Sequence, residues 1–175
     1  GRMAQLLTNI PVSVSAQTVN RLCGSSMTAI HTAATQILAG YGDIFIVGGV
    51  EHMGHVPMTL NVDFNPKMTK HFSRGGQNMG LTAELLGKMH KISRQEQGEF
   101  ANRSHQRAAS ATKEGKFRQE IVAIEGHDEF GAPKLLTDDE VFRADSTVEA
   151  LAKLKPVFDP INGTVTAGNA SAISD

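Results

Sequence analysis

The sequence lacks three features that would each have pointed to a class of protein. It has a single cysteine, Cys23, so no disulfide can form within the chain and an oxidising compartment is not indicated. Its 17 lysines and arginines are balanced by 18 acidic residues, which leaves no net field to attract nucleic acid. No apolar run approaches the length of a membrane span, and the N-terminus has no basic segment followed by an apolar stretch. We therefore expect a soluble protein with no nucleic-acid partner and no membrane span.

The first third of the chain has the pattern of an α/β unit. Residues 14–20 alternate small and branched side chains and predict a strand, whereas residues 25–39 have apolar positions at helical spacing. A second strand is predicted over 43–50, and residues 1–10 read as the tail of a helix that Pro11 ends. Strand, helix and strand at this spacing are typical of a right-handed parallel crossover unit.

The remainder of the chain predicts mostly helices and turns. Glu51 to Gly80 is rich in Pro and Gly, has no periodicity and predicts a long loop, which in a compact domain is normally functional or mobile. The elements expected after it are a short helix (82–91), a helix opened by the capping box Ser93-Arg94-Gln95-Glu96 and running to 115, a strand (120–124), a turn-rich hairpin region (126–133) and a helix (147–154).

Cys23 is expected at the turn between the first strand and the following helix. Open parallel sheets bind ligands at the carboxyl ends of their strands, which is where this turn would lie. Unpaired backbone N–H groups in the first turn of a helix favour a thiolate over a thiol, so a cysteine placed there becomes a nucleophile. Burial habits alone favour the other interpretation, a small buried apolar side chain. The flanking Gly24-Ser25-Ser26 favours the nucleophile.

Four stretches of the sequence carry a resemblance to a known family. VNRLCGSSMTAIH and DIFIVGGVEHMGHVPM resemble the nucleophile region of the thiolases, specifically the degradative 3-ketoacyl-CoA thiolases that form the β subunit of bacterial fatty-acid oxidation complexes. GLTAELLGKMHKISRQEQGEFANRSHQRA and KLKPVFDPINGTVTAGNASAISD are similar to later segments of the same family. Together they cover nearly the whole chain in family order.

The resemblance implies an α/β fold made of part of the N-terminal thiolase domain, a layered α-β-α sheet, with an inserted α+β loop domain. The implied division is residues 1–56 for the partial domain with the nucleophile turn, 57–163 for the inserted CoA-binding domain and 164–175 for the return to the first domain. It also implies that an opening strand and helix and a second domain lie outside this chain. In the family the second domain supplies a histidine in Gly-His-Pro, a cysteine in Cys-x-Gly and an Asn-Glu-Ala-Phe loop. None of these motifs occurs here, so we expect the chain alone to be inactive and to expose an apolar face.

The resemblance assigns five further residues to substrate and CoA binding. Arg143 matches a basic residue against the adenine and phosphate end, Leu154 and Ala167 match apolar contacts of the adenine, and Ser171 matches a hydrogen-bond partner of pantetheine. Met79 matches a methionine that lines the acyl-pantetheine tunnel. Taken without the resemblance, Arg143 is a solvated surface residue, Met79 and Leu154 are core residues, and Ser171 caps a turn.

Three further residues bear on the assignment. Asn78 stands where biosynthetic thiolases usually have histidine, which favours the degradative branch. His52 and His55 lack a carboxylate or thiol at ligand spacing, so we expect no metal site there.

The implied activity is acyl transfer in fatty-acid β-oxidation. The Cys23 thiolate attacks the keto carbon of a 3-ketoacyl-CoA, acetyl-CoA leaves, and a second CoA removes the shortened acyl group from the sulfur. The implied partners are acyl-CoA and CoA as substrates, with no cofactor, a second copy in a homodimer formed through residues 14–20, and a hydratase/dehydrogenase α subunit. A cytoplasmic, bacterial location follows, while a mitochondrial or peroxisomal origin stays open.

Two other functions remain open from the sequence. A decarboxylative condensing enzyme of the ketoacyl-synthase kind shares the fold and a nucleophilic cysteine, but it lacks an insertion like 57–163. A non-catalytic acyl-CoA binding module would leave Cys23 incidental. A redox sensor is disfavoured because the chain has no resolving cysteine.

Overall fold

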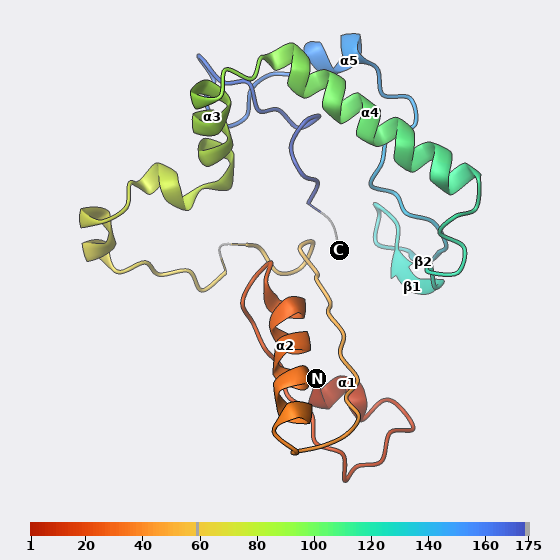
Figure 1. Ribbon diagram of the computed structural model, residues 1–175. Helices are drawn as coiled ribbons and strands as arrows, with labels where there is room; N and C mark the ends of the chain where they lie inside the picture. Colours follow the sequence, from red (N-terminus) through yellow and green to blue (C-terminus); the bar gives the residue numbers. More distant parts are fainter. Residues whose placement is uncertain (59, 174–175) are drawn as a thin grey trace. The chain divides into compact units, whose positions relative to one another are not determined.

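The structure, a computed structural model, describes residues 1–58 and 60–173 and forms two compact units. The first unit contains residues 1–53 and the second begins at Gly54. Figure 1 shows the helices and strands of each unit in sequence colours. The division into residues 1–56, 57–163 and 164–175 stays a prediction.

The first unit contains two helices, α1 (Arg2–Gln5) and α2 (Ser25–Leu38). The predicted helix over 25–39 is confirmed, and it ends where Gly40 adopts a φ of 76°. α1 is much shorter than the helix tail expected to residue 10. Its buried Gln5 donates hydrogen bonds to the carbonyls of Pro11 and Val14, which draws the chain back beside α1 instead.

The two predicted strands of this unit, 14–20 and 43–50, are wrong. The described residues include no backbone hydrogen bond between these segments, so the predicted parallel crossover unit is not formed. A strand is stable only within a ladder of inter-strand hydrogen bonds, and neither segment has such a neighbour. Local alternation of side chains indicated the extended backbone but could not supply its pairing partner.

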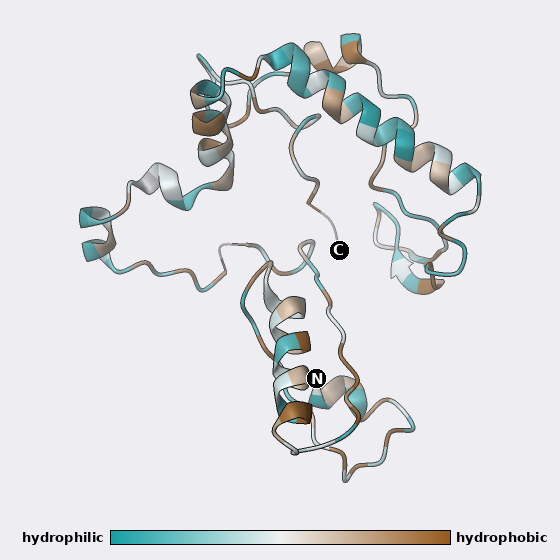
Figure 2. Ribbon diagram, viewed as in Figure 1, coloured by the Kyte–Doolittle hydropathy of each residue, from teal (hydrophilic) through white to brown (hydrophobic). Residues whose placement is uncertain are grey.

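The apolar side chains of the first unit are largely exposed. On α2, Met27 is 56%, Ile30 51% and Leu38 89% exposed, and only Ala33 is buried. Figure 2 shows hydrophobic and hydrophilic residues alternating along this helix. α2 therefore carries exposed apolar side chains, and the docking face expected from the sequence stays a prediction.

The second unit is built from four helical segments, a hairpin and a short C-terminal helix. They are η1 (Pro66–Lys70), η2 (Arg74–Gln77), α3 (Met79–Met89), α4 (Arg94–Lys113), β1 (Ile124–His127), β2 (Pro133–Leu136) and α5 (Val148–Ala152). The predicted helices and the capping box are confirmed, because the Ser93 hydroxyl accepts from the Glu96 N–H and the Glu96 carboxylate accepts from the Ser93 N–H. Figure 2 shows α4 as predominantly hydrophilic.

The strand predicted over 120–124 is also wrong, because β1 begins only at Ile124. The N–H groups of Glu120 and Ile121 both donate to the carbonyl of Phe117, which holds these residues in a turn. β1 pairs antiparallel with β2, with Ile124 opposite Leu136. The Asp128 carboxylate accepts from the N–H groups of Ala132 and Phe130, which closes the hairpin and lowers the pKa of that carboxyl.

The interior of the second unit is organised around Glu84 on α3. Its side chain, 4% exposed, accepts from the N–H groups of Thr164 and Val165 and from the Thr164 hydroxyl, at 2.8–3.0 Å. Burial by itself raises the pKa of Glu84, but the hydrogen bonds from Val165 and Thr164 outweigh it and leave the pKa below its usual value. Asn169 extends the network, donating to the Gln97 side chain on α4 and to the Thr164 carbonyl.

Over the described residues, no helix is long and apolar enough to span a membrane. Within the same ranges no three side chains of His, Cys, Asp or Glu are grouped so that they could hold a metal ion.

Candidate functional site

Cys23 is exposed and lies two residues before α2. The N-cap residue is Gly24, and no side chain caps this helix. In the part of the chain that the structure describes, the N–H groups of Ser26 and Met27 have no hydrogen-bond acceptor. Cys23 is thus an exposed residue two positions before a helix whose first turn has two unpaired donors.

The backbone N–H groups that follow Cys23 most closely in sequence are not available as free donors. The structure shows that Gly24 donates to the carbonyl of Arg21 at 3.1 Å and that Ser25 donates to the carbonyl of Leu22 at 2.9 Å. The free donors therefore begin at Ser26.

A second segment of the first unit reaches the start of α2. Gly49 lies so close to the Ser26 hydroxyl that a β-carbon at position 49 would collide with it. At Gly48 a β-carbon would meet no atom within 4 Å. The close approach of the Ser26 hydroxyl is therefore a specific reason for glycine at position 49.

Arg143 lies on a loop that α4 holds in place. The backbone N–H of Arg143 donates to Nδ1 of His105 at 3.0 Å, and Gln106 donates to the carbonyls of Ala144 and Ser146 at 3.1 and 3.0 Å. The Arg143 side chain is exposed, so its guanidinium is accessible to a ligand. His105 and Gln106 were not identified from the sequence, since contacts 38 and 40 residues apart leave no local pattern.

Three more of the predicted CoA contacts lie along the last part of the second unit. Leu154 is 40% exposed, and its Cδ1 lies against the backbone of Gly168, which follows Ala167. Leu154 and Ala167 therefore lie on neighbouring backbone segments, as two contacts of one flat ring would require. Ser171 is exposed and lies four residues beyond Ala167.

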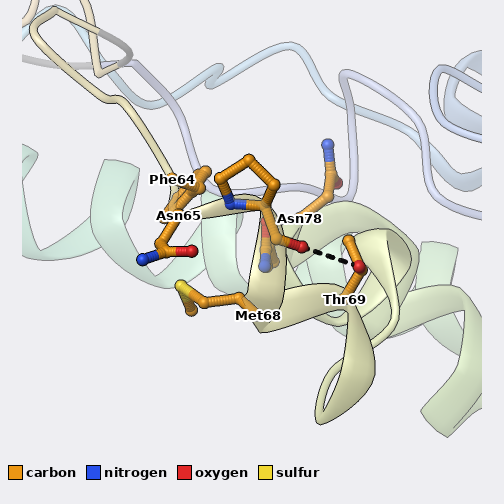
Figure 3. Close-up of a pocket in the computed structure, with 7 residues that line it drawn as sticks. Phe64, Asn65, Met68, Thr69 and Asn78 are labelled. Atoms are coloured by element: carbon orange, nitrogen blue, oxygen red, sulfur yellow. Dashed lines mark hydrogen bonds between the residues drawn. The ribbon is translucent and has the colours of Figure 1, made fainter.

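Met79 begins α3, and its side chain is 84% exposed. The preceding Asn78 caps the helix by accepting the N–H of Leu81 at 3.1 Å. Asn78 also lines a pocket of about 450 Å³ with Phe64, Asn65 and Met68, shown in Figure 3. Met79 is not among the residues that line this pocket.

The predicted site residues divide between the two units. Cys23 belongs to the first unit, whereas Met79, Arg143, Leu154, Ala167 and Ser171 belong to the second. Within the second unit the structure places Leu154 beside the segment of Ala167, and α4 supports the Arg143 loop. The roles of all six residues stay predictions.

Comparison with known proteins gives a consistent result over the whole chain. A family model described as the thiolase N-terminal domain matches residues 1–175. The chain is 62% identical over 174 residues to a 3-ketoacyl-CoA thiolase of Aeromonas hydrophila, covering 99% of this chain and 45% of that protein. It is 57% identical over 175 residues to a 3-ketoacyl-CoA thiolase of Psychrobacter cryohalolentis, covering 100% and 45%. The chain thus spans under half the length of these relatives.

Solved structures agree with the sequence matches. The dimeric peroxisomal thiolase of Saccharomyces cerevisiae superposes with a TM-score of 0.80 at 36% identity, covering 97% of this chain and 44% of that one. An acetyl-CoA acetyltransferase of Bacillus anthracis superposes with a TM-score of 0.78 at 36% identity, covering 97% and 46%. The chain trace follows that of these proteins although the ladder of the predicted parallel sheet is not formed.

Proposed function

This chain belongs to the thiolase family through its N-terminal domain, and from that membership we propose that it supplies the nucleophile and the CoA contacts of a 3-ketoacyl-CoA thiolase. The α/β fold class predicted from the sequence is confirmed by the family match and by the solved structures. The observation that supports the proposal most directly is the exposed Cys23 at the start of α2, beside free backbone donors.

The proposed reaction proceeds in two half-reactions through Cys23. The thiolate attacks the keto carbon of a 3-ketoacyl-CoA, the bond between that carbon and the α-carbon breaks, and the electron pair leaves with the α-carbon. A proton then converts the leaving enolate to acetyl-CoA, while the shortened acyl group stays on the sulfur. The thiolate of a second CoA attacks this thioester and releases Cys23. The second half-reaction exchanges the Cys23 thioester for a CoA thioester and is nearly balanced in energy, so the acyl group is not trapped on the sulfur.

The second unit is proposed to hold the CoA. An exposed guanidinium at Arg143 can stack on adenine and bind phosphate oxygens, and its loop is fixed by three hydrogen bonds from α4. Leu154 and the segment of Ala167 offer apolar surface for the base, with Ser171 further along for pantetheine. Met79 is proposed to contact the acyl-pantetheine arm. CoA acts as a substrate, and the proposal includes no cofactor or metal.

The partners and location follow the same reasoning. We propose a homodimer formed through residues 14–20, whose backbone groups have no ladder partner among the described residues. A hydratase/dehydrogenase α subunit of a fatty-acid oxidation complex is proposed as a further partner. A cytoplasmic location in a bacterium is proposed, in line with the bacterial relatives.

One labelling experiment tests the proposal on the chain itself. Acetyl-CoA is the product of the second half-reaction for a two-carbon acyl group, so its reversal transfers acetyl to the Cys23 sulfur and releases CoA. Complete turnover is not expected of the chain alone, but this single transfer needs only the Cys23 thiolate and acetyl-CoA. Intact-mass measurement should therefore show one acetyl group, mapped to Cys23 by peptide analysis and absent from Cys23→Ala.

Two results would contradict the proposed function. CoA binding by calorimetry without acetylation of Cys23 would support the non-catalytic binding module instead. Acetyl groups scattered over lysines, at equal levels in the wild type and Cys23→Ala, would also contradict the proposal.

A further inference from the structure

The residue before Cys23 has an uncommon backbone conformation. Leu22 has a φ of 50°, in the left-handed region that glycine and asparagine tolerate and a branched side chain disfavours. Its side chain is 78% exposed, so no burial of the leucine compensates for this conformation. Strained residues of this kind persist where their surroundings fix them, and they cluster at functional sites.

Two polar side chains fix the backbone on both sides of Leu22. The Asn20 carboxamide oxygen accepts the N–H of Leu22 at 3.0 Å. The Ser25 hydroxyl accepts the N–H of Arg21 at 2.8 Å and donates to the carbonyl of Leu22 at 2.6 Å. The N–H of the strained residue is therefore bonded to the Asn20 side chain, and its carbonyl accepts from both the hydroxyl and the backbone N–H of Ser25.

The conformation of Leu22 sets the direction in which the chain enters Cys23. With the opposite sign of φ at Leu22, the peptide that leads into Cys23 would leave in another direction, and the sulfur would move relative to the free N–H groups of Ser26 and Met27. Ser25 also begins α2, so its hydroxyl ties the strained residue to the first turn of the helix.

From this geometry we infer that Ser25, with Asn20, is a positioning residue: it holds Leu22 in the left-handed conformation and so fixes the Cys23 sulfur at the start of α2. The inference rests on the proposed function only in naming Cys23 as the nucleophile. It assigns the placement of the Cys23 sulfur to Asn20, Leu22 and Ser25, none of which touches the substrate in this proposal.

The test measures the alkylation rate of Cys23 by iodoacetamide, read by intact mass. Ser25→Ala should slow alkylation about fivefold, since a side-chain hydrogen bond shifts a conformational equilibrium by about a factor of five. Ser25→Thr keeps the hydroxyl and should retain the wild-type rate. Ser13→Ala is the control, because Ser13 is an exposed serine of the same unit whose hydroxyl makes no hydrogen bond among the described residues, and it should also react at the wild-type rate.

Rescue separates positioning from a general structural role. Glycine adopts a φ of 50° without steric cost, so Leu22→Gly added to Ser25→Ala should restore the alkylation rate. A Ser25→Ala rate equal to the wild type, or a slow rate that Leu22→Gly leaves slow, would overturn the inference. If Ser25→Ala does not fold, as judged by circular dichroism, Asn20→Ala takes its place. Asn20→Ala should also slow alkylation, and adding Leu22→Gly should restore the rate.

The acetyl-CoA labelling described above keeps the two proposals apart. Alkylation that responds to Ser25 and Leu22 as expected, in a chain whose Cys23 takes no acetyl group, would support the positioning role and contradict the proposed function. Acetylation of Cys23 at equal rates in the wild type and in Ser25→Ala would support the proposed function and contradict the positioning role.

Discussion

The imidazole Nδ1 of His105 accepts a hydrogen bond from the backbone N–H of Arg143 at 3.0 Å, which joins α4 to a loop 38 residues further along the chain. Because Nδ1 is the acceptor, the neutral ring carries its proton on Nε2. The loop that bears the proposed CoA-binding arginine is therefore held by a side chain that makes no proposed ligand contact.

The first prediction concerns this bond. His105→Leu removes the acceptor and should weaken CoA binding about fivefold, because one hydrogen bond contributes about 1 kcal/mol and the Arg143 loop is less ordered without it. His105→Asn keeps an oxygen near the position of Nδ1 and should bind CoA close to the wild-type affinity. Titration calorimetry with CoA measures both. Equal affinities for the Leu and Asn variants would show that the bond does not order the CoA site.

The second prediction concerns Glu84, whose carboxylate is the acceptor for three donors of Thr164 and Val165. Glu84→Gln replaces one acceptor oxygen by an NH₂ group that faces those donors, and it should lower the free energy of unfolding by about 2–4 kcal/mol. Urea denaturation measures the change. Glu120→Gln, at an exposed position whose carboxylate makes no hydrogen bond in the described chain, is the control and should be within about 0.5 kcal/mol of the wild type. A change no larger than the control's would mean that the network does not stabilise this unit.

The third prediction follows from the pKa of Glu84, which is lower in the folded chain than its usual value of 4.5. Above pH 4.5 the carboxylate is charged in both states, and its full stabilising contribution is present. As the pH falls below 4.5, the unfolded state binds the proton first, so this contribution declines and is lost once the pH passes the folded-state pKa. The difference in unfolding free energy between the wild type and Glu84→Gln should therefore be constant from pH 7 to 5 and shrink below 4.5. A difference that stayed the same at pH 3.5 would contradict the sign of this shift.

Sequence patterns predicted the elements whose signals are local. α2 and α4 follow from apolar spacing and from the capping box at Ser93, which lie within single turns of helix. The sequence could not predict that residues 14–20 and 43–50 stay unpaired, because alternation indicates an extended backbone but not a neighbour. The contact of Glu84 with Thr164 joins positions 80 residues apart, and no local pattern marks it.

In the candidate site too, features with a local sequence signal were predictable and those that depend on distant contacts were not. Cys23 at a helix start was predictable because the glycine and serines after it lie within one turn. The left-handed Leu22 was missed, although Asn20 two residues before it offered a signal, since asparagine side chains accept backbone N–H groups two residues on. The His105 support of Arg143 depends on the packing of a loop against α4 and was not predictable.

The fourth prediction concerns the close approach of Gly49 to Ser26, which lies in the first turn of α2. A β-carbon at Gly49 would collide with the Ser26 hydroxyl but would be at an ordinary 3.5 Å from the Ser26 β-carbon. Gly49→Ala should therefore destabilise the chain by about 1 kcal/mol, at the low end of the cost of overpacking because the Ser26 hydroxyl can rotate, and slow the alkylation of Cys23 as the first turn of α2 adjusts. Gly48→Ala, where a β-carbon meets nothing within 4 Å, is the matched control and should change neither quantity by much.

Removing the obstructing atom distinguishes a steric effect from a loss of backbone freedom. Ser26→Ala eliminates the hydroxyl that the new β-carbon would meet, so the double variant Gly49→Ala with Ser26→Ala should recover both the stability and the alkylation rate. If Gly49→Ala acts by restricting the backbone, the losses of stability and of alkylation rate would instead persist in the double variant, because the alanine at position 49 is still present. Urea denaturation and the iodoacetamide rate, measured on all four variants, complete the cycle. Equal losses in the single and double variants would mean that Gly49 is required for its conformation and that its approach to Ser26 does not shape the start of α2.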